Sequence, residues 1–331
     1  MSRKRLIASA KITILAAILA VVGWELYAAW REVGIARLKA AIDVDWRWSL
    51  MVVLCFAGEL YASAVAWLWL LRRLDPAGSP LFMYGAYFFS QLGKYVPGKI
   101  MLLILRLERT SRLGISGGAV TLSTLMENAT YMLSGAATAV LILLQHLIAR
   151  NPAGRPWLLL LALSSMAVLL TAIHPAVFYG ILNPVLRRLR CPEIAPEQRL
   201  TMNSLLASVA MMSPCWIFGG FASWATIRCL VPIDIGHFWG LVAAFALSVL
   251  AGMISFLPGG FGVREVVQAL LLLPIVTASN PGRAASFAEA ELVVSLAVLL
   301  QRVFQIITEA SLAVLGGWIT TRGRRGRTDQ S

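Results

Sequence analysis

Ionisable residues that fall within or beside long apolar stretches are the side chains of this sequence that could do chemistry. Such residues are costly at membrane depth, and they usually face a cavity or a charged partner. Arginine offers a planar fork to phosphate oxygens, and lysine offers a point charge. The candidates are Glu59, Glu127, Glu265, Glu309, Lys94, Lys99, Arg264 and Arg302.

Lys94, Arg264 and Arg302 are the predicted contacts for an anionic lipid head group. Glu127 and Glu265 are predicted to neutralise these cations in the empty site, or to meet a cationic head group. The alternative is that the charges only pair with one another and fix the register of neighbouring helices. Glu59 stands in the middle of an apolar stretch, which suits a lone protonated acid.

Two interrupted apolar segments place irregular backbone beside these charges. Each contains a Pro-Gly pair next to basic residues, and the pairs are 161 residues apart, close to half the chain. Paired broken segments in corresponding halves point to the substrate site of a transporter. Glycine lets backbone N–H groups approach an anion closely. The predicted binding residues in these segments are Pro97, Gly98, Pro258, Gly259, Gly260 and Gly262.

The elements that must position these residues are membrane helices. The chain of 331 residues is 59% hydrophobic and 14% charged, with a mean hydropathy of +0.76. Uncharged runs at 156–186, 200–227 and 235–263 approach or exceed the roughly 20 residues that cross a bilayer. This composition excludes disorder and argues against a soluble globule. The runs lack the alternation of a transmembrane barrel, so helices are expected.

The sequence therefore predicts an all-α polytopic membrane protein with about 7–8 transmembrane helices, two broken or re-entrant segments and a possible inverted repeat. Basic flanks on both sides of residues 81–105 favour a re-entrant hairpin there, with a single kinked helix as the alternative. A short apolar stretch at 266–276 follows the second break. Full helices are expected at about 12–30, 46–71, 116–147, 157–178, 201–227, 237–256 and 291–320.

We expect one transmembrane domain over residues 12–321, with possible halves 12–178 and 201–321 joined by a cytoplasmic loop at 179–200. The net charge is +13, and 17 basic residues fall on one predicted side against 8 on the other, which places both tails, 1–11 and 322–331, in the cytoplasm. The tails lack aromatic interleaving, so nucleic acid is not an expected partner. Arg72, Arg73, Arg106, Arg109, Arg112, Arg187, Arg188, Arg190 and Arg199 are assigned to the cytoplasmic loops.

Enzyme motifs are missing from the sequence. The cysteines form no CxxC pair, and the three histidines lack metal-ligand spacing. Gly260-Phe261-Gly262 is not a dinucleotide fingerprint, because Glu265 stands where the third glycine belongs. We therefore expect no catalytic residues, no metal and no cofactor.

Four motifs follow one another along the chain: Gly93-Lys94-Tyr95-Val96-Pro97-Gly98-Lys99, Met126-Glu127-Asn128, Leu257-Pro258-Gly259-Gly260-Phe261-Gly262-Val263-Arg264-Glu265, and Arg302. Their order and spacing resemble the lysylphosphatidylglycerol synthase/flippase transmembrane family over roughly residues 10–320. That family usually has Glu-Arg where this chain has Glu127-Asn128, so the partner of Glu127 stays open. The resemblance implies a multi-helix domain that translocates, or helps handle, lipids with charged head groups.

Bifunctional relatives add a soluble domain that uses aminoacyl-tRNA, and we expect no such domain here, because only a short segment follows the last predicted helix. The expected function is therefore flippase-like handling of a polar lipid at the cytoplasmic membrane. The expected partners are membrane lipids with anionic or zwitterionic head groups. One alternative is a non-transporting scaffold of a lipid or glycolipid biosynthesis complex. Another is a polyprenyl-linked membrane glycosyltransferase, for which Asp43 and Asp45 would supply carboxylates.

Overall fold

The computed structural model describes residues 45–76, 78–96, 100–150, 156–188, 194, 196, 199–255, 257–279 and 287–328. Every regular element in these ranges is helical, which confirms the predicted all-α polytopic fold. The predicted helix at 12–30 and the tail at 1–11 lie outside the described residues. Within the described residues, five helical stretches are long and apolar enough to cross a membrane: Trp46–Leu74, Gly117–Gln145, Met202–Arg228, Ile235–Ile254 and Ala290–Thr321.

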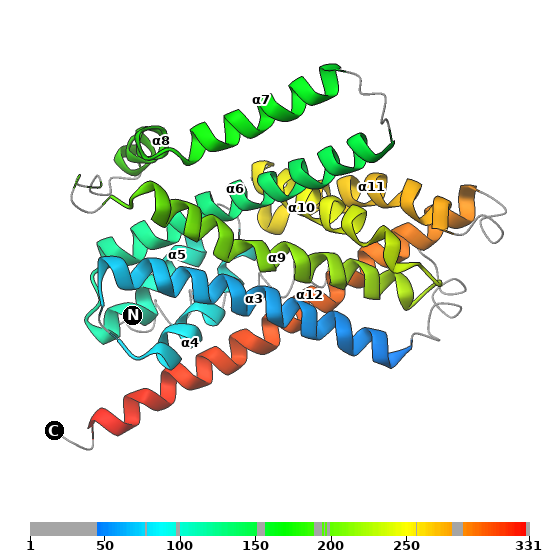
Figure 1. Ribbon diagram of the computed structural model, residues 1–331. Helices are drawn as coiled ribbons and strands as arrows, with labels where there is room; N and C mark the ends of the chain where they lie inside the picture. Colours follow the sequence, from blue (N-terminus) through cyan, green and yellow to red (C-terminus); the bar gives the residue numbers. More distant parts are fainter. Residues whose placement is uncertain are drawn as a thin grey trace.

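Four long helices form the frame of the bundle: α3 (Trp46–Leu74), α6 (Gly117–Arg150), α9 (Met202–Arg228) and α12 (Phe287–Thr328) (Figure 1). Helices α3 and α9 run antiparallel along each other. Arg73 donates to Ser204 over 2.9 Å at one end, and the guanidinium of Arg228 lies 5.2 Å from the Trp48 ring at the other. We call these the Arg73 end and the Trp48 end.

The first interrupted segment is a re-entrant hairpin that enters at the Arg73 end. It consists of α4 (Pro80–Ser90), the 3₁₀ turn η1 (Gln91–Tyr95) and α5 (Ile100–Thr110). The backbone N–H of Ser116, at the start of α6, donates to Asp75 over 2.9 Å, so the chain returns to where it left α3. A Cβ on Gly93 would lie 2.2 Å from the Leu102 nitrogen, and only glycine therefore lets the tip pack against α5.

The second interrupted segment is a hairpin that enters at the opposite, Trp48 end. It consists of α10 (Phe238–Ile254), the 3₁₀ turn η5 (Pro258–Gly260) and α11 (Val263–Ser279), preceded by the short turn η4 (Ile235–His237). Leu241 near the start of α10 packs with Leu272 and Val276 near the end of α11, and with Ile227 from the end of α9. The chain thus leaves and re-enters at one end.

The tips of the two hairpins touch in the middle of the bundle, because the rings of Tyr95 and Phe261 lie 6.0 Å apart. Figure 1 shows α4 and α5 at one end of the bundle, and α10 and α11 toward the other. Two opposed hairpins are the arrangement expected of an inverted repeat. Pro97, Gly98 and Lys99 lie outside the described residues.

The segment between α6 and α9 differs from its prediction. The predicted helix at 157–178 is divided at His174 into α7 (Pro156–Ile173) and α8 (Pro175–Arg188), and α8 occupies much of the predicted loop at 179–200. Phe178, Tyr179 and Leu186 of α8 are buried in one cluster with Leu70 of α3 and residues of α6. This burial stabilises the helix despite Pro184 in its interior.

Basic residues gather at the Arg73 end. Arg109 at the end of α5 donates to Thr320 near the end of α12 over 2.8 Å, and Arg199 lies 5.5 Å from the Tyr179 ring of α8. The helix α12 continues to Thr328, beyond its predicted end at 320. The turn η2 (Ser111–Leu113), with Arg112, belongs to the same end.

Candidate functional site

Charged side chains of both signs meet at and around the two hairpin tips. The cations come from the hairpins and α12, and the acids from α3, α6, α11 and α12. In the described residues these are Lys94, Arg106, Arg264 and Arg302, with Glu59, Glu127, Glu265 and Glu309. Equal numbers of cations and acids at membrane depth require either pairing or a ligand.

The tip of the first hairpin is fastened to α12 through Glu309. The ammonium of Lys94 lies 2.6 Å from one carboxylate oxygen, and the Tyr95 hydroxyl donates to the other over 2.7 Å. Glu309 is only 3% exposed. Glu309 was a candidate site residue with no predicted partner, and in the structure it forms an ion pair with Lys94.

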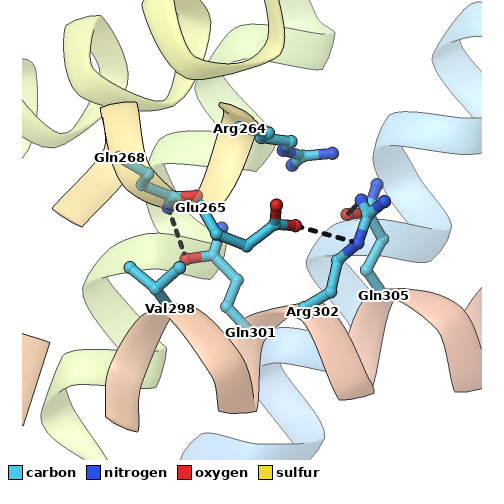
Figure 2. Close-up of a pocket in the computed structure, with 7 residues that line it drawn as sticks. All are labelled: Arg264, Glu265, Gln268, Val298, Gln301, Arg302 and Gln305. Carbon is cyan, nitrogen blue, oxygen red and sulfur yellow. Dashed lines mark hydrogen bonds and ion pairs between the residues drawn. The ribbon is translucent and has the colours of Figure 1, made fainter. Parts of the chain in front are cut away.

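The tip of the second hairpin is fastened to α12 through Arg302. Its guanidinium donates to the Gly259 carbonyl over 2.6 Å and lies 3.3 Å from the Glu265 carboxylate (Figure 2). Gly259 has φ +59°, and a Cβ there would lie 2.9 Å from this guanidinium. Within the described chain, neither Glu265 oxygen accepts a hydrogen bond, so the pair is an ionic contact without aligned donors.

A polar recess separates α11 from α12 beside these contacts (Figure 2). The Gln268 amide donates to the Gln301 side-chain carbonyl over 2.8 Å, and the Gln301 amide donates to Ser223 of α9 over 3.2 Å. The recess is lined by Arg264, Glu265, Gln268, Val298, Gln301, Arg302 and Gln305. These side chains leave no room for a water molecule. The recess is therefore closed in this structure.

Arg264 differs from the other interior cations. It is 8% exposed, and its guanidinium lies 5.0 Å from the Phe245 ring. It makes no hydrogen bond or ion pair with any residue that the structure describes. In Figure 2 its guanidinium lies apart from Glu265, whose carboxylate turns to Arg302 instead. Arg264 is thus a largely buried cation with no hydrogen-bond or ion-pair partner in the described part of the chain.

Glu59 of α3 is the corresponding acid. The Tyr131 hydroxyl donates to its carboxylate over 3.2 Å, and no cation of the described chain lies within ion-pair distance. Glu59 and Arg264 are therefore the two of these eight charges that lack an ion-pair partner in the described chain, and the other six form three pairs.

The third of these pairs, Arg106 with Glu127, corrects two predictions. Arg106 was expected in a cytoplasmic loop, but it is completely buried between the rings of Trp67 and Tyr87, at 4.6 and 4.4 Å. It forms an ion pair with Glu127, which also accepts a hydrogen bond of 2.6 Å from Tyr87. The returning arm of the hairpin carries Arg106 into the core.

Glu127 consequently neutralises Arg106, and not Lys94, Arg264 or Arg302 as predicted. Asn128, which follows it, donates to the Thr124 carbonyl of its own helix over 2.8 Å. A buried acid with no adjacent arginine needs a cation from another element. Asn128, at the position where the family usually has arginine, was the signal for this in the sequence. Which cation supplies the charge depends on how the hairpin folds back.

Comparison with known proteins adds one finding. Residues 9–290 match the family model described as "Lysylphosphatidylglycerol synthase TM region". The matched range includes both hairpins, together with Glu59, Lys94, Glu127 and Arg264, and it ends within the first turn of α12. No curated protein matches the chain.

Proposed function

Because the chain belongs to the family of the lysylphosphatidylglycerol synthase TM region, a membrane-protein family related to lipid handling, we propose that it translocates a polar lipid. The lipid crosses the cytoplasmic membrane between its two leaflets. The protein performs no covalent chemistry on it, and the partners are lipids with anionic or zwitterionic head groups.

The observation that supports this proposal is the meeting of two opposed hairpins at a cluster of interior charges. Non-helical backbone at membrane depth is tolerated only where protein buries it or where it lines a cavity. Here both irregular tips, η1 and η5, lie beside Lys94, Arg264 and Arg302. Transporters built from inverted repeats bind their substrates at this kind of junction.

The unpartnered guanidinium of Arg264 is the proposed first contact for the head group. A largely buried cation without a charged partner is costly at membrane depth, and an anionic oxygen would pair with it. The Glu265–Arg302 contact closes the recess nearby, and an entering anionic group would take the place of the Glu265 carboxylate beside Arg302. Separation of α11 from α12 at their glutamine contacts would open the recess.

The Arg73 end is the proposed cytoplasmic end, because basic residues concentrate on the cytoplasmic side of membrane proteins. The residues that support this orientation are Arg72, Arg73, Arg109, Arg112, Arg187, Arg188 and Arg199. The first hairpin then opens toward the cytoplasm and the second toward the opposite face. Head groups would approach the junction from either leaflet along the corresponding hairpin.

The test is a lipid-translocation assay with the purified protein in vesicles. Fluorescent phosphatidylglycerol, phosphatidylethanolamine and phosphatidylcholine are compared by the accessibility of their label to a membrane-impermeant quencher. We expect faster exchange of at least one lipid, and a loss of about tenfold or more in Arg264→Gln, from one charged hydrogen bond. Arg112→Gln, which changes only an exposed pair with Glu108, is the matched control.

If the protein moves none of these lipids, or if Arg264→Gln moves them as fast as the unchanged protein, the proposal is wrong. A scaffold of a lipid-synthesis complex would then be the better description. Of the two carboxylates that the glycosyltransferase alternative requires, Asp43 lies outside the described residues. The Asp45 carboxylate accepts a hydrogen bond of 3.0 Å from the Arg47 backbone N–H and caps α3.

A further inference from the structure

The Glu265 carboxylate is an acceptor in the recess that has no hydrogen-bond donor. Both of its oxygens are buried, and neither accepts a hydrogen bond within the described chain. Its ion-pair contact is Arg302, whose Nε lies 3.3 Å away and itself makes no hydrogen bond there. The recess leaves no room for a water molecule that could donate instead. Buried acceptors without donors are costly, so these two oxygens are open to donors that enter with a ligand.

Other polar side chains that line the recess donate to one another or to the tip of the second hairpin. Arg302 donates to the Gly259 carbonyl over 2.6 Å, and the Gln268 amide donates to the Gln301 side-chain carbonyl over 2.8 Å. Figure 2 shows the Glu265 carboxylate turned toward Arg302 and away from these two amides. Recognition of the end of a head group therefore falls to Glu265.

The charges that line the recess decide which kind of donor fits. Two arginines, Arg264 and Arg302, and one acid, Glu265, leave one uncompensated positive charge among the lining residues. A phosphodiester monoanion balances this charge. A head group that also carries an ammonium would restore the excess and place a cation beside two guanidinium groups, which is costly at membrane depth. A hydroxyl supplies a donor and adds no charge.

We propose that Glu265 selects lipids in which an anionic phosphodiester carries a hydroxyl-bearing head group, such as glycerol or another polyol. The phosphate takes the place of the Glu265 carboxylate beside Arg302. The released carboxylate then accepts hydrogen bonds from the head-group hydroxyls, and no covalent bond forms or breaks. This inference rests on the proposed function, and it assigns the head-group chemistry and a specificity-determining residue at the same site.

Calorimetry on the purified protein in detergent tests this selection without transport. Short-chain phosphatidylglycerol and phosphatidylpropanol form a matched pair, because they have the same charge and carbon skeleton and differ only in the head-group hydroxyls. We expect phosphatidylglycerol to bind at least about tenfold more tightly, from one hydrogen bond to a charged acceptor. Phosphatidylethanolamine, which carries an ammonium, should also bind more weakly than phosphatidylglycerol.

A soluble compound distinguishes a lipid from a free phosphodiester as the ligand. Glycerophosphoglycerol has the same phosphodiester and hydroxyls but no acyl chains. We expect it to bind at least about tenfold more weakly than short-chain phosphatidylglycerol, because acyl chains add buried apolar surface. Equal binding of the two compounds would overturn the assignment of a lipid as the ligand.

Glu265→Gln keeps the size of the side chain and replaces one acceptor oxygen and the charge. The preference for phosphatidylglycerol over phosphatidylpropanol should fall to about threefold or less, because a neutral acceptor forms weaker hydrogen bonds. Binding of phosphatidylpropanol should persist in this variant, which shows that the site is folded. Glu108→Gln, at the exposed end of α5, is the matched control and should keep the full preference.

If the unchanged protein binds phosphatidylglycerol and phosphatidylpropanol equally, or if Glu265→Gln keeps the full preference, the inference is wrong. Translocation of both lipids at equal rates would overturn the selection alone and leave the proposed function standing. The absence of any lipid translocation would instead overturn the proposed function.

Discussion

The ring of Tyr95 lies 6.0 Å from the ring of Phe261, and this contact joins two hairpins that enter from opposite ends of the bundle. Tyr95 ends the 3₁₀ turn of the first hairpin, and Phe261 directly follows that of the second. Both rings also lie near the guanidinium of Arg302, at 5.9 and 4.6 Å. The junction is therefore held from a third side by α12.

A cysteine pair at these two positions should form a crosslink. Tyr95→Cys and Phe261→Cys are combined in a background in which the native cysteines are alanines, and a short bifunctional maleimide is added to membranes. The control pair joins Tyr95→Cys to Leu272→Cys, which lies toward the Trp48 end of α11. We expect an intramolecular crosslink, seen by peptide mass spectrometry, in the first pair. Equal yields from both pairs would contradict the contact.

The long helices could be predicted from the sequence because long apolar runs fix their positions. The stretches at 46–71 and 201–227 correspond to α3 (Trp46–Leu74) and α9 (Met202–Arg228). The first hairpin was also predictable, because basic residues on both flanks require both ends of the segment to share one side. In each case the information is local in the sequence.

The pairing of charges could not be predicted in this way. Glu127, Glu265 and Glu309 all occur in apolar helices, and nothing local distinguishes which cation each one meets. The structure decides by the depth that each hairpin reaches, which brings Lys94 to Glu309 and Arg106 to Glu127. The helix α8 also depends on contacts distant in the sequence, because its buried residues pack against α3 and α6.

The buried Arg106–Glu127 pair should stabilise the fold without taking part in lipid movement. Arg106→Met leaves Glu127 buried without its cation, so we expect a loss of about 3–5 kcal/mol in the free energy of unfolding. Adding Glu127→Gln should recover a large part of this loss, because it removes the uncompensated charge. Denaturant titration in detergent measures both effects. The exposed Arg112, changed to glutamine, should cost less than about 1 kcal/mol.

If the double variant is less stable than Arg106→Met, then Arg106 and Glu127 are not each other's main partners. The translocation rate per folded molecule is measured as well. If it falls as far in the double variant as in Arg264→Gln, the Arg106–Glu127 pair lies in the transport path. Both results can be obtained from one set of preparations.

The orientation of the bundle can be tested with reporter fusions. A fluorescent protein that folds only in the cytoplasm is fused after Ser331, and alkaline phosphatase is fused at Gly154, in the segment between α6 and α7. Because basic residues gather at the Arg73 end, we expect fluorescence from the first fusion and phosphatase activity from the second. Phosphatase activity from a fusion after Ser331 would show the opposite orientation.

The turn at the tip of the second hairpin should tolerate alanine at one glycine and not at another. Gly260 and Gly262 both have positive φ, at +73° and +80°, so alanine is strained at either position by roughly 1–2 kcal/mol. Their surroundings differ. A Cβ on Gly260 would lie 2.9 Å from the Gly252 Cα of α10, whereas a Cβ on Gly262 would meet nothing within 4 Å.

Gly260→Ala should therefore move the tip away from α10 and cost roughly 1–3 kcal/mol more than Gly262→Ala. The displacement would also shift Arg264, whose Cβ lies 3.2 Å from the position of a Cβ on Gly252, so binding of phosphatidylglycerol should weaken. Denaturant titration measures the first effect, and calorimetry on the folded protein measures the second. Equal stabilities of the two variants would show that the tip does not pack against α10 as described. In that case, contact with the α10 backbone would not be what positions Arg264 at the junction of the two hairpins.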